Sequence, residues 1–453
     1  MTLPNYFLAD LPPEATLSAA MLGDACQTLK HNRERYLAHR STHSLVSLLC
    51  DVAQGWLEPD NAFRKLALEQ GPAATGFSAA TLASGLDCFF RQFTPDNFQA
   101  LLEQDLGHVH RLDRIVAAEV EQGANRSAIA VGPELLVHIA AGNLPVPALM
   151  SIVLGVLVRS AQFVKCATGT TLLPRLFAHS LYEAEPKLGA CLEIAAWPGG
   201  DHTLSDALFN EADCVTATGT DVTLESIRMR LPARARFIAY GHRVSFAFVS
   251  HRVLHGQSAR KVVERAAADV VAWNQLGCLS PHLIYVEQGG SLTAERFAEA
   301  LAEELEQREA HEPRGELPVE AAAAIASRRS LYEVRAAHSP DTRQWVSRNS
   351  TAWTVVYEAD PRFQLSCLNR FIYVKSVQHL AEALQNADSV RGKVSTVGLA
   401  APDAQAHELA TELARWGVAR VCPLGQMQNP PLAWRHDGRP GLADLVRWTD
   451  WEM

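Results

Sequence analysis

The sequence predicts an α/β protein in which a helical N-terminal lead-in precedes two doubly wound lobes, each built on a parallel sheet. In the N-terminal part, apolar residues recur at helical spacing, as in NFQALLEQDLGHVHRLDRIV. From Ser127 onward, short β-branched or apolar runs such as SAIAVG and LLVHIAAG alternate with helical stretches. Strands that alternate with helices indicate βαβ units and a mainly parallel sheet.

We expect the helical region over residues 1–125 and the first lobe over 126–243. A second alternating block opens with the strand RVSFAFVS, and we assign it to residues 244–420. Its strands HLIYVEQ and RFIYVKS are separated by a helical insert rich in Ala and Glu over 293–331. The remaining residues, 421–453, are dense in Pro, Gly and Trp and show little regular period. Ordered segments of that kind are usually functional loops.

Length and charge limit the class of protein. A chain of 453 residues is long for one domain, because single cores stop growing near roughly 250 to 300 residues. The formal net charge of -9 argues against binding to nucleic acid or an anionic membrane surface by bulk attraction. A few Lys and Arg residues and helix N-termini can still hold an acidic cofactor.

The cysteines and the apolar runs indicate a cytoplasmic protein. The nine cysteines include no CxxC pair, so neither a disulfide framework nor a zinc site is predicted. The start of the chain lacks a basic region followed by an apolar run, so we expect no export signal and a reducing cytoplasm. The longest apolar stretch, Val146 to Val158, falls short of the ~20 residues that a membrane span needs and predicts a buried helix.

Cys278 is the first candidate for chemistry. In VAWNQLGCLSPHLIYVE, a helical run ends at Gly277 and a strand begins after Pro281, which places the thiol on an exposed turn at the edge of a sheet. A cysteine is the best side-chain nucleophile for a thioester, because it exchanges thiol for thiol when its surroundings favour the thiolate. The alternative is that this cysteine is a small buried hydrophobic residue.

Asn143 is the second candidate. It lies in AAGNLPVP, where a strand breaks at Gly142 and Pro145 precedes a long apolar helix. An amide at such a corner can donate to a developing oxyanion, and removing such a donor costs on the order of 3 kcal/mol in comparable sites. The alternative is a helix cap.

Two further turns suit a cofactor. Lys165 ends an apolar strand and precedes a small polar turn that includes Thr168, and a cation there is a natural seat for ribose or phosphate. Thr218, Gly219 and Thr220 follow another strand and open a helix, where a glycine permits close approach of a pyrophosphate. A surface lysine and a plain turn remain alternatives, and the GxGxxG fingerprint is absent.

Taken in order, these pieces resemble the aldehyde dehydrogenase superfamily: an Asn-x-Pro turn, a strand that ends in Lys, a Thr-Gly-Thr turn and a later Cys. Within it the sequence looks closest to the LuxC-type acyl-CoA reductases, which have counterparts of AAGNLPVP, WNQLGCLSPH, LSCLNR and CPLGQMQNPPLAWRHDG. The resemblance covers residues 125 to 453. It implies an aldehyde-dehydrogenase-like fold, with a nicotinamide-cofactor domain over 126–243, a catalytic domain over 244–420 and a C-terminal segment that closes the site.

The resemblance also implies roles for residues. Cys278 would be the acylated nucleophile, and Asn143 with the Cys278 backbone N–H would form the oxyanion hole. Lys165 would hold the adenosine ribose, and the Thr218 to Thr220 turn would lie along the cofactor. Many NAD-preferring relatives carry a Glu where this chain has Thr168, so a 2′-phosphate would not be repelled, and NADPH is favoured over NADH.

A second departure concerns the Glu with which the oxidising enzymes activate water. The corresponding stretch here is AYGHRVS, which has no carboxylate, so an acyl-cysteine would persist until a thiol or a hydride attacks it. His242 and His436 are candidates for the proton donor to the leaving thiol. Cys367 and Asn369 in LSCLNR either line the nicotinamide pocket or pack against the sheet.

The expected function is NADPH-dependent reduction of a fatty acyl thioester, carried by coenzyme A or a carrier protein, to the aldehyde. An acyl ligase, an acyltransferase or a carrier protein would be the partner, and a homo-oligomer is expected. Three alternatives remain open: an acyltransferase or thioesterase that uses Cys278 without nicotinamide, an aldehyde dehydrogenase independent of coenzyme A, and a noncatalytic scaffold.

Overall fold

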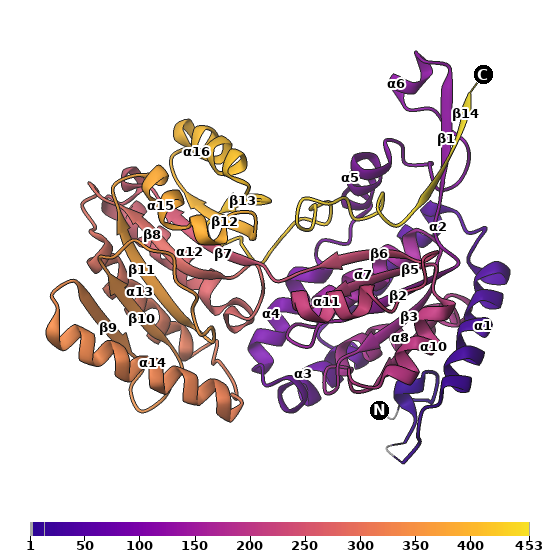
Figure 1. The fold of residues 1–453 in the computed structure, drawn as a ribbon, viewed down its shortest axis with the longest axis horizontal. Coiled ribbons are helices and arrows are strands. Elements are labelled where there is room, and N and C mark those ends of the chain that lie inside the picture. The colour runs from indigo at the N-terminus through magenta and orange to yellow at the C-terminus, as the bar shows by residue number, and fades with distance from the viewer. Residues whose placement is uncertain (1–2, 13, 453) are drawn as a thin grey trace. The chain divides into compact units, whose positions relative to one another are not determined.

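The computed structural model describes residues 3–12 and 14–452. The chain divides into two compact units (Figure 1). The first unit comprises Met1–Thr75, Leu86–Gly241 and Pro431–Met453, and the second comprises Gly76–Gly85 and His242–Pro430.

A five-stranded parallel sheet forms the centre of the first unit. Its strand order is β4-β3-β2-β5-β6. The strands are β2 (Leu135–Ile139), β3 (Ala161–Cys166), β4 (Leu192–Ala196), β5 (Cys214–Thr218) and β6 (Arg236–Tyr240). The strand order reverses between β2 and β5, and ligands of such sheets bind at the carboxyl ends of the strands beside that reversal.

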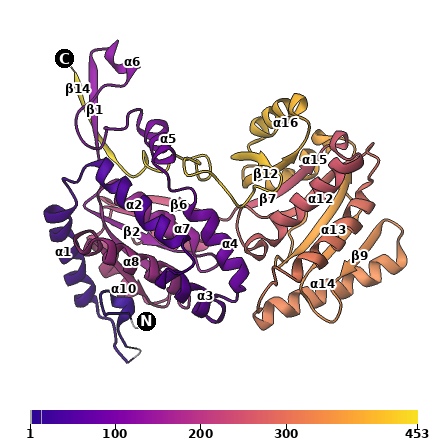
Figure 2. The same cartoon turned by 180° about the vertical axis from the view of Figure 1, so that it is seen from behind.

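Helices cover this sheet. The connecting helices are α7 (Val146–Leu157), α8 (Leu172–Ala184), α9 (Pro186–Gly189), α10 (His202–Glu211) and α11 (Asp221–Arg228). The N-terminal elements are η1 (Leu8–Asp10), α1 (Ala19–Tyr36), α2 (Thr42–Leu57), α3 (Ala62–Thr75), α4 (Ala79–Phe90), α5 (Pro95–Leu106) and α6 (Glu119–Gln122). In the first unit α1 packs against α10, and α2 packs against α7 and α8 (Figure 2). Apart from residues 76–85, which belong to the second unit, the helical lead-in therefore completes the core of this sheet.

The predicted buried helix over residues 146–158 is α7. Within residues 3–12 and 14–452, no helix has the length and apolar character that crossing a bilayer requires. A two-stranded antiparallel ribbon, β1 (Arg126–Val131) and β14 (Arg447–Glu452), also belongs to the first unit. All six residues of β14 are exposed.

The second unit is built on a seven-stranded sheet with the order β13-β12-β7-β8-β11-β10-β9. Its strands are β7 (Val244–Val249), β8 (Pro281–Glu287), β9 (Thr342–Val346), β10 (Thr354–Glu358), β11 (Phe371–Val377), β12 (Val394–Ala400) and β13 (Arg420–Pro423). All neighbours are parallel except β9, which pairs antiparallel with β10 at one edge. A parallel sheet of this kind is buried on both faces.

Two separate hydrophobic cores cover those faces. One contains α12 (Gly256–Val271) and α13 (Ala294–Glu309), and the other contains α14 (Val319–His338), α15 (Leu380–Asn386) and α16 (Asp403–Trp416). Short 3-10 turns complete the unit: η2 (His251–Val253), η3 (Ala272–Gln275) and η4 (Asp388–Val390). The predicted fold class, two doubly wound parallel-sheet lobes with a helical lead-in, is confirmed.

Candidate active site

Cys278 lies in the second unit, on the loop between η3 and β8. The sequence suggested a helix that continues to Gly277, but α12 ends at Val271. Cys278 is half-buried rather than fully exposed, and its carbonyl accepts a hydrogen bond from Ser245 Oγ at 2.7 Å. Because β8 begins at Pro281, the cysteine stands at the amino edge of the sheet.

The helix ends early because the chain enters a left-handed conformation. Trp273, Asn274 and Gln275 have φ angles of 50°, 51° and 64°. Residues other than glycine adopt this region at a cost of about 1 to 3 kcal/mol each, and they do so only where the surrounding structure imposes it. Such strained residues cluster at functional sites.

A second left-handed run holds the first in place. Leu368, Asn369 and Arg370 have φ angles of 62°, 56° and 65°. Arg370 Nε donates to Asn274 Oδ1 at 3.1 Å. Gln275 Nε2 donates to the carbonyls of Pro281 at 2.7 Å and Phe371 at 3.0 Å. The approach to Cys278 is thus tied to the start of β11.

The two residues of LSCLNR that the sequence suggested for the nicotinamide pocket lie here: Asn369 is in this second run, and Cys367 directly precedes it. Cys367 is half-buried, and burial raises the pKa of its thiol. Asn369 is buried. Since β11 and β8 are parallel neighbours, the loops that carry Cys367 and Cys278 lie at the same edge of the sheet.

Two histidines also belong to that edge. His242 is exposed and lies two residues before β7, which is the other neighbour of β8. His282, at the start of β8, was not predicted from the sequence. Burial, with a further contribution from His242, lowers the pKa of His282 to about 4. Its Nδ1 accepts the N–H of Ser366 at 3.1 Å, so His282 is a neutral acceptor in the same loop cluster.

In the first unit, the predicted oxyanion donor Asn143 and the predicted cofactor residues lie at the carboxyl ends of the parallel strands. Asn143 follows β2 and is exposed. The N-cap position of α7 belongs to Pro145, so Asn143 does not cap this helix. Thr218 is the last residue of β5, on the other side of the reversal in strand order, and the turn continues through Gly219 and Thr220. Both turns therefore lie where the fold favours a ligand.

Lys165 is the penultimate residue of β3, which ends at Cys166, and it is 9% exposed. Burial lowers the pKa of its ammonium group, and Nζ lies 5.7 Å from the centre of the Trp197 ring. Across the part of the chain that the structure describes, no carboxylate forms an ion pair with Lys165. Thr168 is exposed in the next turn. A buried cation without a carboxylate partner fits an anionic ligand.

The turn at residues 218–220 opens α11. Thr220 is its N-cap and accepts the N–H of Thr223 at 3.3 Å. The Gly219 N–H donates to the Tyr240 carbonyl at 3.2 Å. A Cβ at Gly219 would make only ordinary contact with Thr223, at 3.6 Å, so the fold alone does not require glycine here. The glycine leaves the backbone open to a ligand.

His436 belongs to the first unit, whereas His242 belongs to the second. The His436 ring stacks on Tyr240, with ring centres 4.3 Å apart and an interplanar angle of 9°. The structure thus groups Asn143, Lys165 and the 218–220 turn in one unit, and Cys278 with His242 in the other.

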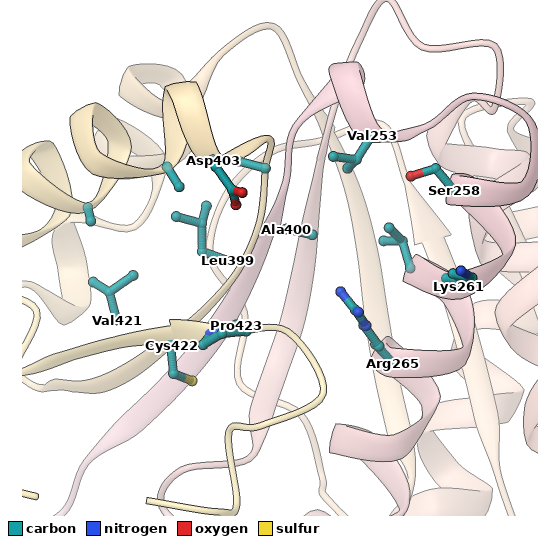
Figure 3. A pocket seen from close by; sticks show the side chains of 14 residues that line it. Val253, Ser258, Lys261, Arg265, Leu399, Ala400, Asp403, Val421, Cys422 and Pro423 are labelled. Carbon is teal, nitrogen blue, oxygen red and sulfur yellow. The ribbon is translucent and has the colours of Figure 1, made fainter. Parts of the chain in front are cut away.

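The second unit also has a cavity of about 600 Å³, which does not involve Cys278. It opens where β12 and β13 end, at the carboxyl edge of the sheet. Figure 3 shows Lys261 and Arg265 of α12 on one side of it and Asp403 of α16 on the other. Since Cys278 stands at the amino edge, this cavity is separate from the candidate site.

Solved structures identify the fold. The chain is similar to a bifunctional proline utilization A protein, with a TM-score of 0.72 and 16% identity over 98% of this chain and 46% of that chain. It is also similar to an NAD-dependent benzaldehyde dehydrogenase from Corynebacterium glutamicum, with a TM-score of 0.68 and 13% identity over 99% of this chain and 94% of that chain. The protein therefore has the fold of the aldehyde dehydrogenases.

The sequence model of the acyl-CoA reductase (LuxC) family matches residues 37–448. The chain belongs to this family, as the sequence motifs indicated. Curated relatives include a long-chain acyl-protein thioester reductase of Aliivibrio fischeri, 23% identical over 90% of this chain and 82% of the relative. A protein of the same name from Photorhabdus laumondii is 22% identical over the same shares.

Proposed function

We propose that this protein reduces a fatty acyl thioester to the aldehyde, with NADPH as the reductant and Cys278 as the nucleophile. The observation that carries the proposal is the half-buried cysteine on a loop held by two left-handed runs, in a chain of the LuxC family. The names of the relatives support a long-chain acyl group.

In the proposed reaction, the Cys278 thiolate attacks the thioester carbonyl and the carbonyl oxygen becomes an oxyanion. The Asn143 amide and the Cys278 N–H donate to this oxyanion. Collapse expels the carrier thiol, which takes a proton from His242 or His436, and leaves an acyl-enzyme. A bound nicotinamide cofactor supplies a hydride to the acyl carbon. The resulting thiohemiacetal oxyanion forms at the same oxygen, so one set of donors serves both steps before the aldehyde and the thiolate separate.

We further propose that NADPH binds the first unit. Lys165 would pair with the 2′-phosphate and ribose, Thr168 offers no repelling carboxylate, and the turn of Thr218, Gly219 and Thr220 at the start of α11 would lie along the pyrophosphate.

A variant pair tests the cofactor assignment. Lys165→Met should raise the KM for NADPH by about tenfold or more, because the charge-assisted bond to the 2′-phosphate is lost. It should raise the KM for NADH less, because NADH loses only the contact with the ribose. Lys187→Met is the control, since Lys187 is exposed in α9. Equal losses with both cofactors would contradict the role of the 2′-phosphate.

The acyl donor is proposed to be coenzyme A or a carrier protein in the cytoplasm, supplied by an acyl ligase or acyltransferase, and the enzyme is proposed to act as a homo-oligomer. The test is anaerobic incubation with a panel of acyl-CoA thioesters and acylated carrier protein, with NADPH or NADH, followed by cofactor absorbance and aldehyde analysis.

Cys278→Ala should abolish turnover in this assay. Cys367→Ala, the half-buried cysteine at the same edge of the sheet, should retain most of it. Acyl transfer without cofactor consumption would favour the acyltransferase alternative, and aldehyde oxidation without coenzyme A would favour an ordinary aldehyde dehydrogenase.

A further inference from the structure

The side chain of Gln428 contacts both ends of the short turn that carries Cys278. Its Nε2 donates to Ser280 Oγ at 2.5 Å. Ser280 closes the turn by donating its N–H to the Gly277 carbonyl at 2.9 Å. A Cβ at Gly277 would overlap the amide of Gln428. Since Gly277 does not have a left-handed backbone, the missing side chain makes room for this amide.

The turn that presents Gln428 is anchored to the buried end of α12. Asp269 is 2% exposed, and its two oxygens accept the N–H groups of Gly425 at 2.5 Å and Met427 at 2.9 Å. Burial raises the pKa of Asp269 to about 7, although these two donors and Arg420 act in the opposite direction. Arg420 also donates to the Met427 carbonyl at 2.7 Å, so this turn is held through both its N–H and its carbonyl groups.

We propose that Gln428 is a positioning residue for Cys278, and that Asp269 fixes the turn from which Gln428 reaches it. This inference rests on the proposed function, because it assigns Gln428 to the acylation of Cys278. Attack on a carbonyl requires the reacting atoms about 3 to 3.5 Å apart and aligned, and a misplacement of about 1 Å can cost ~100-fold in rate. Gln428 restrains the residues on both sides of the cysteine.

The first test compares Gln428→Ala with Gln426→Ala. Gln426 is the matched control, because it lies in the same turn but its side chain is exposed. Rapid mixing with saturating acyl-CoA, followed by acid quench and mass analysis, gives the rate constant of Cys278 acylation. Gln428→Ala should lower it ~10- to 100-fold, with a half-saturating concentration like that of the wild type, and Gln426→Ala should leave both unchanged. A role limited to fold stability would lower the acylated fraction and leave the rate constant of the remaining protein intact.

A double variant tests the shared contact. Gly277→Ala should slow acylation because its Cβ displaces the Gln428 amide. Once Gln428→Ala has removed that amide, the added methyl group should cost nothing more, so the double variant should match Gln428→Ala. Losses that multiply in the double variant, or a wild-type rate in Gln428→Ala, would overturn the proposal.

Hydrogen exchange without any substrate separates this inference from the proposed function. The peptide that spans residues 277–280 should exchange faster in Gln428→Ala than in Gln426→Ala. If no thioester acylates even the wild type, the proposed function fails, while faster exchange still supports the contact. Unchanged exchange overturns the positioning role whatever the reaction is.

Discussion

Replacing Asn274 by Ala tests how the structure holds the approach to Cys278. Asn274 is 3% exposed with a φ of 51°. Its Nδ2 donates to the Arg314 carbonyl at 2.7 Å, and its Oδ1 accepts from Arg370 Nε at 3.1 Å. The variant leaves two buried groups without these partners, at about 1 to 3 kcal/mol each. It also places Ala in the left-handed region, which Asn tolerates better, at an additional cost of about 1 kcal/mol.

The matched control is Asn349→Ala. Asn349 has a φ of 54° but is exposed, so its variant carries the backbone cost alone. We therefore expect Asn274→Ala to lower the free energy of local opening in the second unit by ~2 to 6 kcal/mol more than the control does.

Hydrogen exchange of the peptides that contain residues 273–275 and 368–370 measures that opening, and the acylation rate of Cys278 gives the functional consequence. Protection should fall in both peptides, since each run holds the other. Equal protection in Asn274→Ala and Asn349→Ala would refute the idea that the two runs stabilise each other through this side chain.

Two further predictions concern the first unit. Burial lowers the pKa of His138 to about 4. The folded state therefore binds a proton at this residue less readily than the unfolded chain does. The free energy of unfolding should fall by ~3 kcal/mol in total as the pH decreases from about 6.5 to 4. His138→Gln should lack that loss, and parallel thermal midpoints of the two proteins from pH 7 to 4 would contradict the assignment. Gly155→Ala should lower the free energy of unfolding by ~1 to 3 kcal/mol, because its Cβ would overlap the fully buried Gln162, and thermal unfolding measures this loss. Gly23→Ala in α1, where no atom lies within 4 Å, should instead stabilise by ~0.5 to 1 kcal/mol, and a loss of similar size in both variants would argue against overlap as the cause.

Much of the fold could be predicted because a strand that is buried on both faces of a parallel sheet has a nearly continuous run of apolar residues. The run AQFVKC, which forms β3, is buried at every position, and a run of this kind is typical of a central strand. The edge strand β14 has no such apolar run. β14 has the sequence RWTDWE and is exposed throughout, so it shows no alternation between apolar and polar residues.

The support of the site could not be predicted for a different reason. Trp273, Asn274 and Gln275 continue the preceding helical pattern, and nothing local stops the helix. Their left-handed conformation is imposed by Arg370 and Phe371, which lie far away in the sequence. Cys278 itself could be chosen from its place between a helix and a strand and from the family motif, and its role remains a prediction.

The sequence alone does not reveal buried polar groups whose burial depends on tertiary packing. In the sequence, nothing distinguishes His282 from other residues at the start of a strand. Only the packing of β8 shows that His282 is buried. Asp269 looks like a charge on the solvent face of α12 until its two N–H donors are seen. The general rule that a buried charge needs partners identifies such groups only after burial is known.

Whether the acyl group passes through Cys278 can be decided by a single-turnover experiment. The wild type is mixed with a long-chain acyl-CoA in the absence of cofactor, quenched, and digested for peptide mass analysis. We expect one acyl adduct, located on Cys278, that is released as aldehyde in equal molar amount when NADPH is added. An adduct on another residue, or NADPH oxidation with aldehyde release in Cys278→Ala, would contradict this expectation.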